Sequence, residues 1–103
     1  MKRAEVTVVN RLGLHARPSA ALTQLATRFA AEVFLSKGSR RVNGKSIMGV
    51  MMLAAAQGSV IVVETDGADE DKALEALVGL ISSGFGEATG EGAATGPIGD
   101  EGR

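Results

Sequence analysis

The chain has 103 residues, 45% of them hydrophobic, which is enough for one domain with an ordinary core. It has one histidine and no cysteine, so we expect neither a disulfide framework nor a metal site. The opening residues are too interrupted by charge for a signal peptide, and no apolar run approaches the ~20 residues of a membrane span, so we expect a cytoplasmic protein without membrane insertion.

The first half of the chain predicts short alternating elements. Residues 4–9 are rich in β-branched side chains and indicate a strand. From Ala16 the apolar residues change to helical spacing, and the face they form consists of Leu22, Leu25, Ala26 and Phe29. Period-two alternation returns at 31–36, a turn is predicted at 38–39, and 40–44 is predicted as a short return strand.

The second half adds a helix, a strand and a final helix. Residues 46–55 are too long and too rich in methionine for a strand and predict a short helix, weakened by Gly49. Residues 59–65 give the strongest strand pattern in the chain. Acidic residues at 69–71 favour the first turn of the last helix because they oppose the positive end of its dipole. The apolar face of that helix consists of Leu74, Leu77, Val78 and Ile81.

The order β-α-β-β-α-β-α predicts the α+β class. Four strands would form an antiparallel sheet covered on one face by helices, a two-layer open-faced β-sandwich. Near Gly84 the composition changes, and seven of the fourteen glycines lie between there and the last residue. We therefore expect a domain of residues 1–86 and a Gly-rich, disordered tail of residues 87–103.

Charge is distributed unevenly along the chain. Residues 1–46 hold nine lysines and arginines against two glutamates, whereas residues 47–103 hold two basic residues against ten acidic ones. A basic first half favours an anionic ligand or an acidic partner. Nucleic acid is not expected as a partner, because the absence of Tyr and Trp leaves few side chains for base stacking.

The only histidine, His15, lies in the segment LGLHARPSA. Pro18 favours the first turn of a helix, so His15 is predicted at or just before the helix N-terminus. Histidine is a poor cap there, and a positive imidazolium would meet the positive end of the dipole. A structural role therefore explains this histidine poorly.

A role in carrying negative charge explains His15 better. The backbone amides of Ala16 and Arg17 would form an anion cradle at the helix N-terminus, and the Arg17 guanidinium is suited to a phosphoryl group. A neutral imidazole is a nucleophile, and Gly13 permits an unusual backbone in the preceding loop. Without a second histidine, a cysteine or an acid–base pair, the residues do not describe a complete enzyme.

The motif GLHARP, followed some thirty residues later by GKSIMGVMMLAA, resembles the HPr family, the histidine phosphocarriers of the bacterial phosphoenolpyruvate-dependent sugar phosphotransferase system. The resemblance covers residues 1 to about 86 and implies the HPr-like fold and a non-enzymatic carrier without a cofactor. It implies that His15 takes a phosphoryl group on Nδ1 from enzyme I and passes it to IIA-type proteins, with Arg17 stabilising that group. We expect the carrier to be a monomer.

Ser46 follows Asn43-Gly44-Lys45 and opens the predicted short helix, where its simplest role is that of an N-cap. The resemblance implies a second role, because Ser46 matches the serine that HPr kinase/phosphorylase phosphorylates in many bacteria. A phosphoserine at a helix N-terminus is tolerated electrostatically. Capping alone and capping combined with regulation both remain open.

The short helix also predicts an apolar surface. Ile47, Met48, Met51 and Met52 cannot all face inward on so short a helix, and Met48 is predicted to be exposed. The resemblance implies that partners dock on this surface, with contacts from Ala20, Gln24, Ile47, Met48 and Met51. Many HPr proteins carry lysine where this chain has Gln24 and Thr27, and this departure leaves the contacts to acidic partners open.

Two alternative functions remain open. The segments RLGLHARP and LISSGFGE resemble NPr, the carrier of the nitrogen branch, whereas KSIMGVM favours the sugar branch. The third hypothesis is a docking module that uses the HPr fold without phosphorylation. The pairing of His15 with Arg17 argues against it, since a docking module has no need of a nucleophile.

Overall fold

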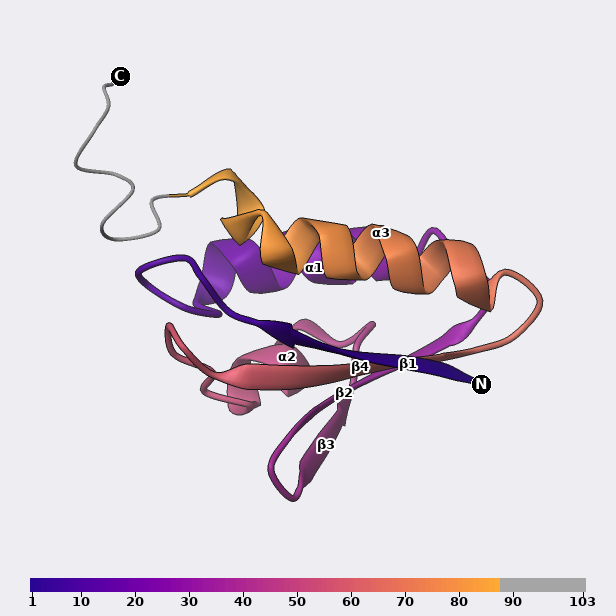
Figure 1. The fold of residues 1–103 in the computed structure, drawn as a ribbon, viewed down its shortest axis with the longest axis horizontal. Coiled ribbons are helices and arrows are strands. Elements are labelled where there is room, and N and C mark those ends of the chain that lie inside the picture. The colour runs from indigo at the N-terminus through magenta and orange to yellow at the C-terminus, as the bar shows by residue number, and fades with distance from the viewer. Residues whose placement is uncertain (88–103) are drawn as a thin grey trace.

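Four strands form one antiparallel sheet, in the spatial order β1-β4-β2-β3 (Figure 1). The computed structural model describes residues 1–87, so the predicted tail lies outside the described residues except for Glu87. The strands are β1 (Lys2–Thr7), β2 (Glu32–Lys37), β3 (Arg40–Asn43) and β4 (Val60–Asp66). The predicted class and element order are confirmed.

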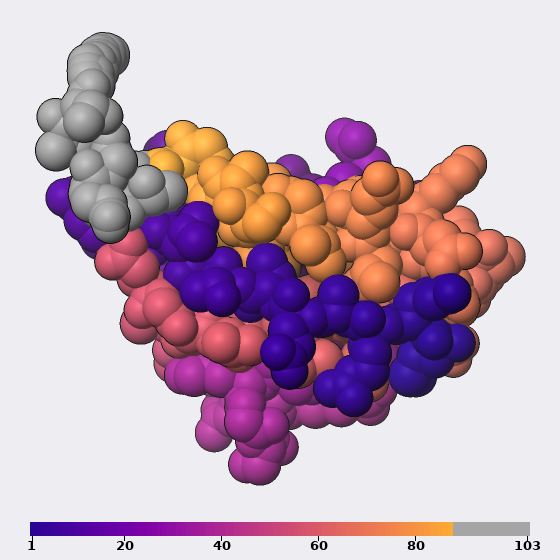
Figure 2. Space-filling view, in the orientation of Figure 1, coloured from indigo at the N-terminus to yellow at the C-terminus, as the bar shows by residue number. Residues whose placement is uncertain are grey.

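The helices are α1 (Ala16–Ala26), α2 (Ile47–Met52) and α3 (Glu70–Ser82), and a short 3₁₀ turn, η1 (Gly84–Gly86), follows α3. Helices α1 and α3 contact each other and lie on the same face of the sheet, as Figure 1 shows. Helix α3 packs directly on β1 and β4, and Figure 2 shows this orange and yellow segment lying along the indigo strand. Helix α2 contacts α1 and β3. This layering buries one face of the sheet and leaves α2 at its margin.

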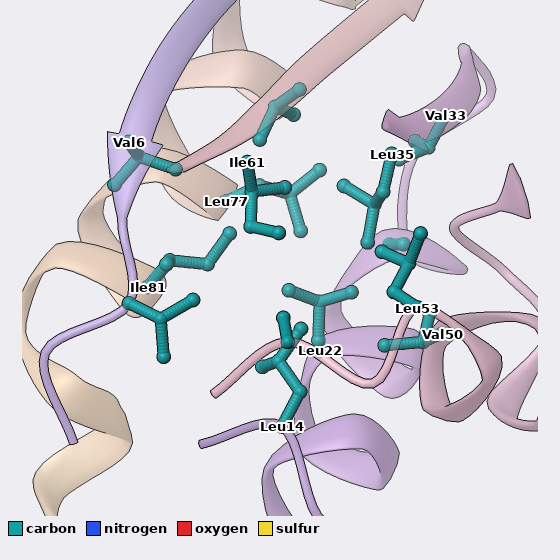
Figure 3. Close-up of a cluster of buried hydrophobic side chains, with 14 residues drawn as sticks. Val6, Leu14, Leu22, Val33, Leu35, Val50, Leu53, Ile61, Leu77 and Ile81 are labelled. Atoms are coloured by element: carbon teal, nitrogen blue, oxygen red, sulfur yellow. The ribbon is translucent and has the colours of Figure 1, made fainter. Parts of the chain in front are cut away.

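The core fills the space between the sheet and the helices (Figure 3). Inward-facing strand residues alternate with more exposed ones, as in Val33 and Leu35 of β2, because successive strand side chains point to opposite faces. Leu14 joins the core from the loop before α1 and lies beside Leu22 in Figure 3. The residue before the histidine is therefore anchored in the hydrophobic interior.

Two predicted boundaries in the first half were wrong by a few residues. Strand β1 begins at Lys2, which pairs with Thr65, and ends at Thr7. Val8 still donates its N–H to Ser59 O (2.9 Å), but it lies in the loop beyond the ladder. Helix α1 ends at Ala26 and does not include Phe29, because the chain tightens there into hydrogen bonds between residues three apart.

The later elements differ from the predictions in smaller ways. Helix α2 is shorter than the predicted 46–55 and ends at Met52. The fully buried stripe of α3 is Ala73, Leu77 and Ile81, while Leu74 and Val78 are half-buried against the core. Strands 31–36, 40–44 and 59–65 were predicted to within one residue at each end.

Asp69 joins α3 to the loop after α1. It is the N-cap residue of α3, but its carboxylate makes no capping hydrogen bond. It accepts hydrogen bonds instead from the N–H groups of Ala30 (2.9 Å) and Ala31 (2.8 Å). These bonds, that from Ala30 first, hold the pKa of Asp69 below its ordinary value. The carboxylate thus connects two segments that are 38 residues apart in the chain.

The link predicts an acid-dependent loss of stability. A pKa that is lower in the folded state stabilises the fold above the ordinary value of 3.8, and this stabilisation is lost as the pH falls through the folded-state pKa. Asp69→Asn should therefore lower the melting temperature at neutral pH and flatten its decline in acid. Thermal melts across pH test this, with Asp71→Asn as the control because Asp71 forms only an exposed ion pair with Lys2. Equal acid profiles for Asp69→Asn and the wild type would contradict the link.

Candidate functional site

The loop before α1 is held against the segment that follows α2. Gly13 has a φ of +68°, and a Cβ there would lie 2.4 Å from Ala55 O. The next residue, Leu14, donates its N–H to the same carbonyl (2.9 Å). Glycine is needed at this position both for the left-handed backbone and for the close approach. The contact fixes the backbone immediately before His15.

His15 is the N-cap residue of α1, as its position before Pro18 predicted. Its side chain makes no capping hydrogen bond, and its carbonyl accepts the first helical bond from Ser19 N–H (3.0 Å). The imidazole is about one-third exposed (36%), so the ring is accessible. The first-turn amides of Ala16 and Arg17 have no carbonyl within the helix to accept their hydrogen bonds. Ring and amides therefore lie together at the N-terminus of α1.

Glu87 is a site residue that the sequence analysis missed, having assigned it to the tail. Its carboxylate oxygens lie 3.1 and 3.2 Å from His15 Nε2. Asn10, fully buried in the loop after β1, donates its Nδ2–H to Glu87 Oε1 (3.1 Å). Figure 1 shows the end of the described chain at the same end of the molecule as the loop before α1. The repeated glycines of this segment indicated a tail, and no local pattern pointed to a partner 72 residues away.

An open hollow of about 510 Å³ lies in front of the imidazole. It is lined by Arg11, Leu12, His15, Ala16, Arg17 and Glu87. Both arginines are exposed, and neither forms a hydrogen bond or ion pair with another described residue. Arg11 was also missed by the sequence analysis, because its place in a turn gave no sign of this proximity. A nucleophilic ring beside two exposed guanidinium groups suits a phosphoryl group.

Ser46 is the N-cap residue of α2, as predicted. Its Oγ accepts a hydrogen bond from Gly49 N–H (3.1 Å). The other end of the helix is held by two cations of the β2–β3 hairpin. Lys37 Nζ donates to Leu53 O (3.4 Å) and Ala54 O (3.2 Å), and Arg40 donates to Met52 O (3.0 Å). Polar groups at both ends therefore define this six-residue helix.

Helix α2 carries an exposed apolar surface, here called the α2 patch. It consists of Ile47, Met48, Met51 and Met52. Met48 is 74% exposed, the most of the four, which confirms its predicted exposure. The other three are exposed as well, and only Val50 of this helix is buried, so none of the four faces inward. Four large apolar side chains in solvent suggest a binding surface.

The predicted partner contacts come from two helices that touch each other. On α1, Ala20 is half-buried and Gln24 is exposed, while the remaining contacts belong to the α2 patch. Helices α1 and α2 pack together, and α1 also carries His15 at its N-terminus. The structure therefore connects the histidine hollow to the α2 patch through adjacent elements. No helix among residues 1–87 is long and apolar enough to cross a bilayer.

Comparison with known proteins defines the class to which this fold and site belong. Residues 2–83 match a family model described as the phosphorylation site of the HPr component of the phosphotransferase system. The chain belongs to the HPr family of bacterial phosphocarrier proteins.

Individual relatives agree with this membership. The chain is 56% identical over 87 residues to the phosphocarrier protein HPr of Neisseria meningitidis serogroup A, covering 84% of this chain and 98% of the relative. The crystal structure of HPr-C-His from Thermoanaerobacter tengcongensis superposes with a TM-score of 0.81 at 45% identity, covering 84% of this chain and 98% of the other. A structure described as an HPr dimer from the same organism gives a TM-score of 0.68 at 45% identity, with coverages of 84% and 100%.

Proposed function

We propose that this HPr protein carries a phosphoryl group on His15. It accepts the group from phosphorylated enzyme I and passes it to IIA-type proteins, without acting as an enzyme itself. The observation that carries the proposal is the accessible imidazole at the N-terminus of α1, in a hollow lined by two exposed guanidinium groups. A lone pair of the neutral ring would form the new N–P bond while the bond from phosphorus to the donor breaks. The electron pair of the broken bond stays with the donor.

The surroundings of His15 assign a role to each neighbour. Arg17, with its exposed planar guanidinium, would stabilise the phosphoryl oxygens by paired hydrogen bonds. The amides of Ala16 and Arg17 would complete the cradle, since they point outward from the first turn of α1. The α2 patch, with Ala20 and Gln24, would dock the partners beside the histidine. No metal or cofactor takes part in this proposal.

The proposal is tested directly by phosphorylation. The protein is incubated with phosphoenolpyruvate and enzyme I from the same organism, and its intact mass is measured. A gain of one phosphoryl group that is labile in acid and stable in base is the expected result. Transfer onward to a sugar-type or a nitrogen-type IIA protein distinguishes the two branches. An HPr fold that docks partners but gains no mass would support the non-phosphorylated docking module instead.

We also propose that the carrier acts as a monomer in the cytoplasm, where its partners would be reached by diffusion. One solved relative is described as a dimer, so the oligomeric state requires its own measurement. Size-exclusion chromatography with light scattering distinguishes a chain of 10.5 kDa from a pair.

His15→Ala should abolish phosphorylation while leaving the fold intact. The side chain makes no capping hydrogen bond and is not part of the core, so its removal leaves the packing of α1 unchanged. The chain contains no other imidazole. Intact mass after incubation with enzyme I and phosphoenolpyruvate measures the loss, and a thermal melt checks the fold. A folded variant that still gains an acid-labile phosphoryl group would contradict the assignment.

Arg17→Lys should slow transfer about 10-fold or more, because lysine keeps the charge but loses the forked donor geometry, and one charge-assisted hydrogen bond is worth about 1.5 kcal/mol or more. The rate of phosphoryl transfer from enzyme I measures the effect. Arg28→Lys is the matched control, since Arg28 is exposed just beyond the other end of α1. If both variants transfer at the wild-type rate, Arg17 does not contact the phosphoryl group.

Ser46→Asp should weaken docking of enzyme I without unfolding α2. The new charge would lie beside the α2 patch and face the acidic surface expected on enzyme I, where like charges cost several kcal/mol. Aspartate caps a helix as well as serine does, so the fold is kept. We propose that phosphorylation by HPr kinase/phosphorylase acts in the same way. Titration calorimetry with enzyme I measures the loss of affinity.

Two further variants separate charge from capping. Ser46→Asn is the matched control, because asparagine has the shape and capping ability of aspartate without its charge. It should bind like the wild type. Ser46→Ala should lose about 1 kcal/mol of stability with docking nearly unchanged. Wild-type affinity in Ser46→Asp would leave Ser46 with its capping role alone.

A further inference from the structure

We infer that Glu87 is a positioning residue that fixes the tautomer of His15 and so leaves Nδ1 free to accept the phosphoryl group. The inference rests on the proposed function and names the part of the chain that prepares its nucleophile. His15 Nε2 lies 3.1 and 3.2 Å from the two carboxylate oxygens of Glu87.

The chemistry of the contact determines where the imidazole proton lies. An ionised carboxylate can only accept hydrogen bonds, so Nε2 must carry the hydrogen in this contact. A neutral imidazole has one N–H and one lone pair, and the hydrogen bond made by one nitrogen sets the state of the other. With Nε2 donating to Glu87, the lone pair of the neutral ring is on Nδ1. The contact also favours one orientation of the ring.

Asn10 holds the carboxylate in this position. Its amide group donates to Gly13 O (2.7 Å) and to Glu87 Oε1 (3.1 Å). Both partners are acceptors, which excludes the flipped orientation of the amide. The remaining oxygen, Asn10 Oδ1, is buried without a hydrogen-bond partner among the described residues. An unsatisfied buried acceptor is unfavourable. We attribute it to the orientation of the Asn10 amide that lets Nδ2 donate to Glu87.

The backbone of residues 84–87 brings Glu87 back to the histidine. Gly84, Phe85 and Gly86 all have positive φ angles, of 74°, 58° and 75°. The turn is closed by the N–H of Glu87, which donates to Gly84 O (2.9 Å). Phe85 packs against the core although a left-handed backbone is unfavourable for a residue with a large side chain. The Gly-Phe-Gly segment thus works as an anchored reversal of the chain after α3.

The same contact suits the transfer step. When the Nδ1 lone pair bonds to phosphorus, the ring retains its Nε2–H and gains positive charge. The negative Glu87 carboxylate stabilises that positive charge at the Nε2 edge of the ring. Arg11 and Arg17, which line the same hollow, are available to the phosphoryl oxygens. These three side chains are the charged groups that line the hollow around His15. The carboxylate accepts the hydrogen bond from Nε2–H and does not block Nδ1, where the phosphoryl group would bind.

The experiment compares the full-length wild type with Glu87→Ala, which removes the acceptor, and Glu87→Gln, which removes only the charge. Glu5→Gln is the control, because this substitution removes the same charge at an exposed position of β1. Nitrogen-15 NMR of the imidazole, at a pH where the ring is neutral, reports the tautomer through the separation of the Nδ1 and Nε2 resonances. The rate of phosphoryl transfer from enzyme I is measured in parallel.

The separation of the resonances should shrink in Glu87→Ala and stay close to that of the wild type in Glu87→Gln, whose amide oxygen can still accept. Transfer should slow about 5- to 10-fold in Glu87→Ala, as expected for one partly exposed hydrogen bond to a charged group, and less in Glu87→Gln. An unchanged separation in Glu87→Ala would overturn the inference whatever the rate. A reduced separation with a wild-type rate would overturn the positioning role in transfer.

Failure of the proposed function gives a different result. In that case the wild type itself would gain no phosphoryl group, and the role of Glu87 in transfer would fall with it. The NMR measurement needs no phosphorylation, so it would still show whether Glu87 fixes the tautomer. Glu87→Ala leaves one N–H of the buried Asn10 amide without its acceptor and should lower the melting temperature, whereas Glu87→Gln keeps an acceptor and should melt close to Glu5→Gln, so thermal melts separate loss of stability from loss of the tautomer.

Discussion

The arrangement of the site depends on the close contact between Gly13 and the backbone of Ala55. No side chain can be placed on residue 13 without striking that carbonyl at 2.4 Å, and Leu14 N–H donates to the same oxygen. The contact joins the loop before α1 to the segment after α2. It therefore holds His15 on one side and the α2 patch on the other in a fixed relation. The proposed phosphoryl transfer needs such a relation, because a misplaced reacting atom slows transfer steeply.

The core supports this contact from below. Leu14 is buried next to Leu22 of α1, and Ala55 is buried at the end of the α2 segment. Both residues belong to the same cluster as the inward-facing side chains of β2 and β4. Closely packed interiors deform little, so the loop inherits the rigidity of the sheet and helices beneath it. The partly exposed imidazole is thus attached to backbone that is fixed on both sides.

The parts of this structure that follow local rules could be predicted from the sequence. Period-two alternation located the strands, and Ser46 and Pro18 marked the starts of α2 and α1, because capping and proline geometry act within one turn. The limits of β1 could not be predicted, since they depend on where β4 offers partners, as in the pair Lys2 and Thr65. The exposure of Ile47 and Met51 also depends on what the rest of the chain leaves uncovered. Periodicity alone does not contain that information.

The position of Glu87 beside His15 could not be predicted from local sequence patterns. Its partner is 72 residues away, and the glycines around it indicated a tail. The same glycines allow the left-handed backbone that returns the chain to His15. A glycine-rich composition is compatible with both disorder and a tight reversal. Two tertiary contacts distinguish them: Phe85 packs against the core, and buried Asn10 donates to the Glu87 carboxylate.

Backbone strain, an unsatisfied buried polar atom and exposed apolar side chains are all found at the end of the molecule that carries His15. Ala54, next to the Gly13 contact, and Phe85, next to Glu87, are the only residues other than glycine with positive φ in residues 1–87. Asn10 Oδ1 is buried without a partner, and the α2 patch leaves four large apolar side chains in solvent. The opposite end, where Asp69 binds two backbone amides, satisfies its polar groups in the ordinary way. Strain and exposed apolar surface persist where the surrounding structure imposes them, and they are concentrated at sites that bind or react. Their distribution here coincides with the elements to which the proposed function assigns phosphoryl transfer and docking, from Glu87 through His15 to α2.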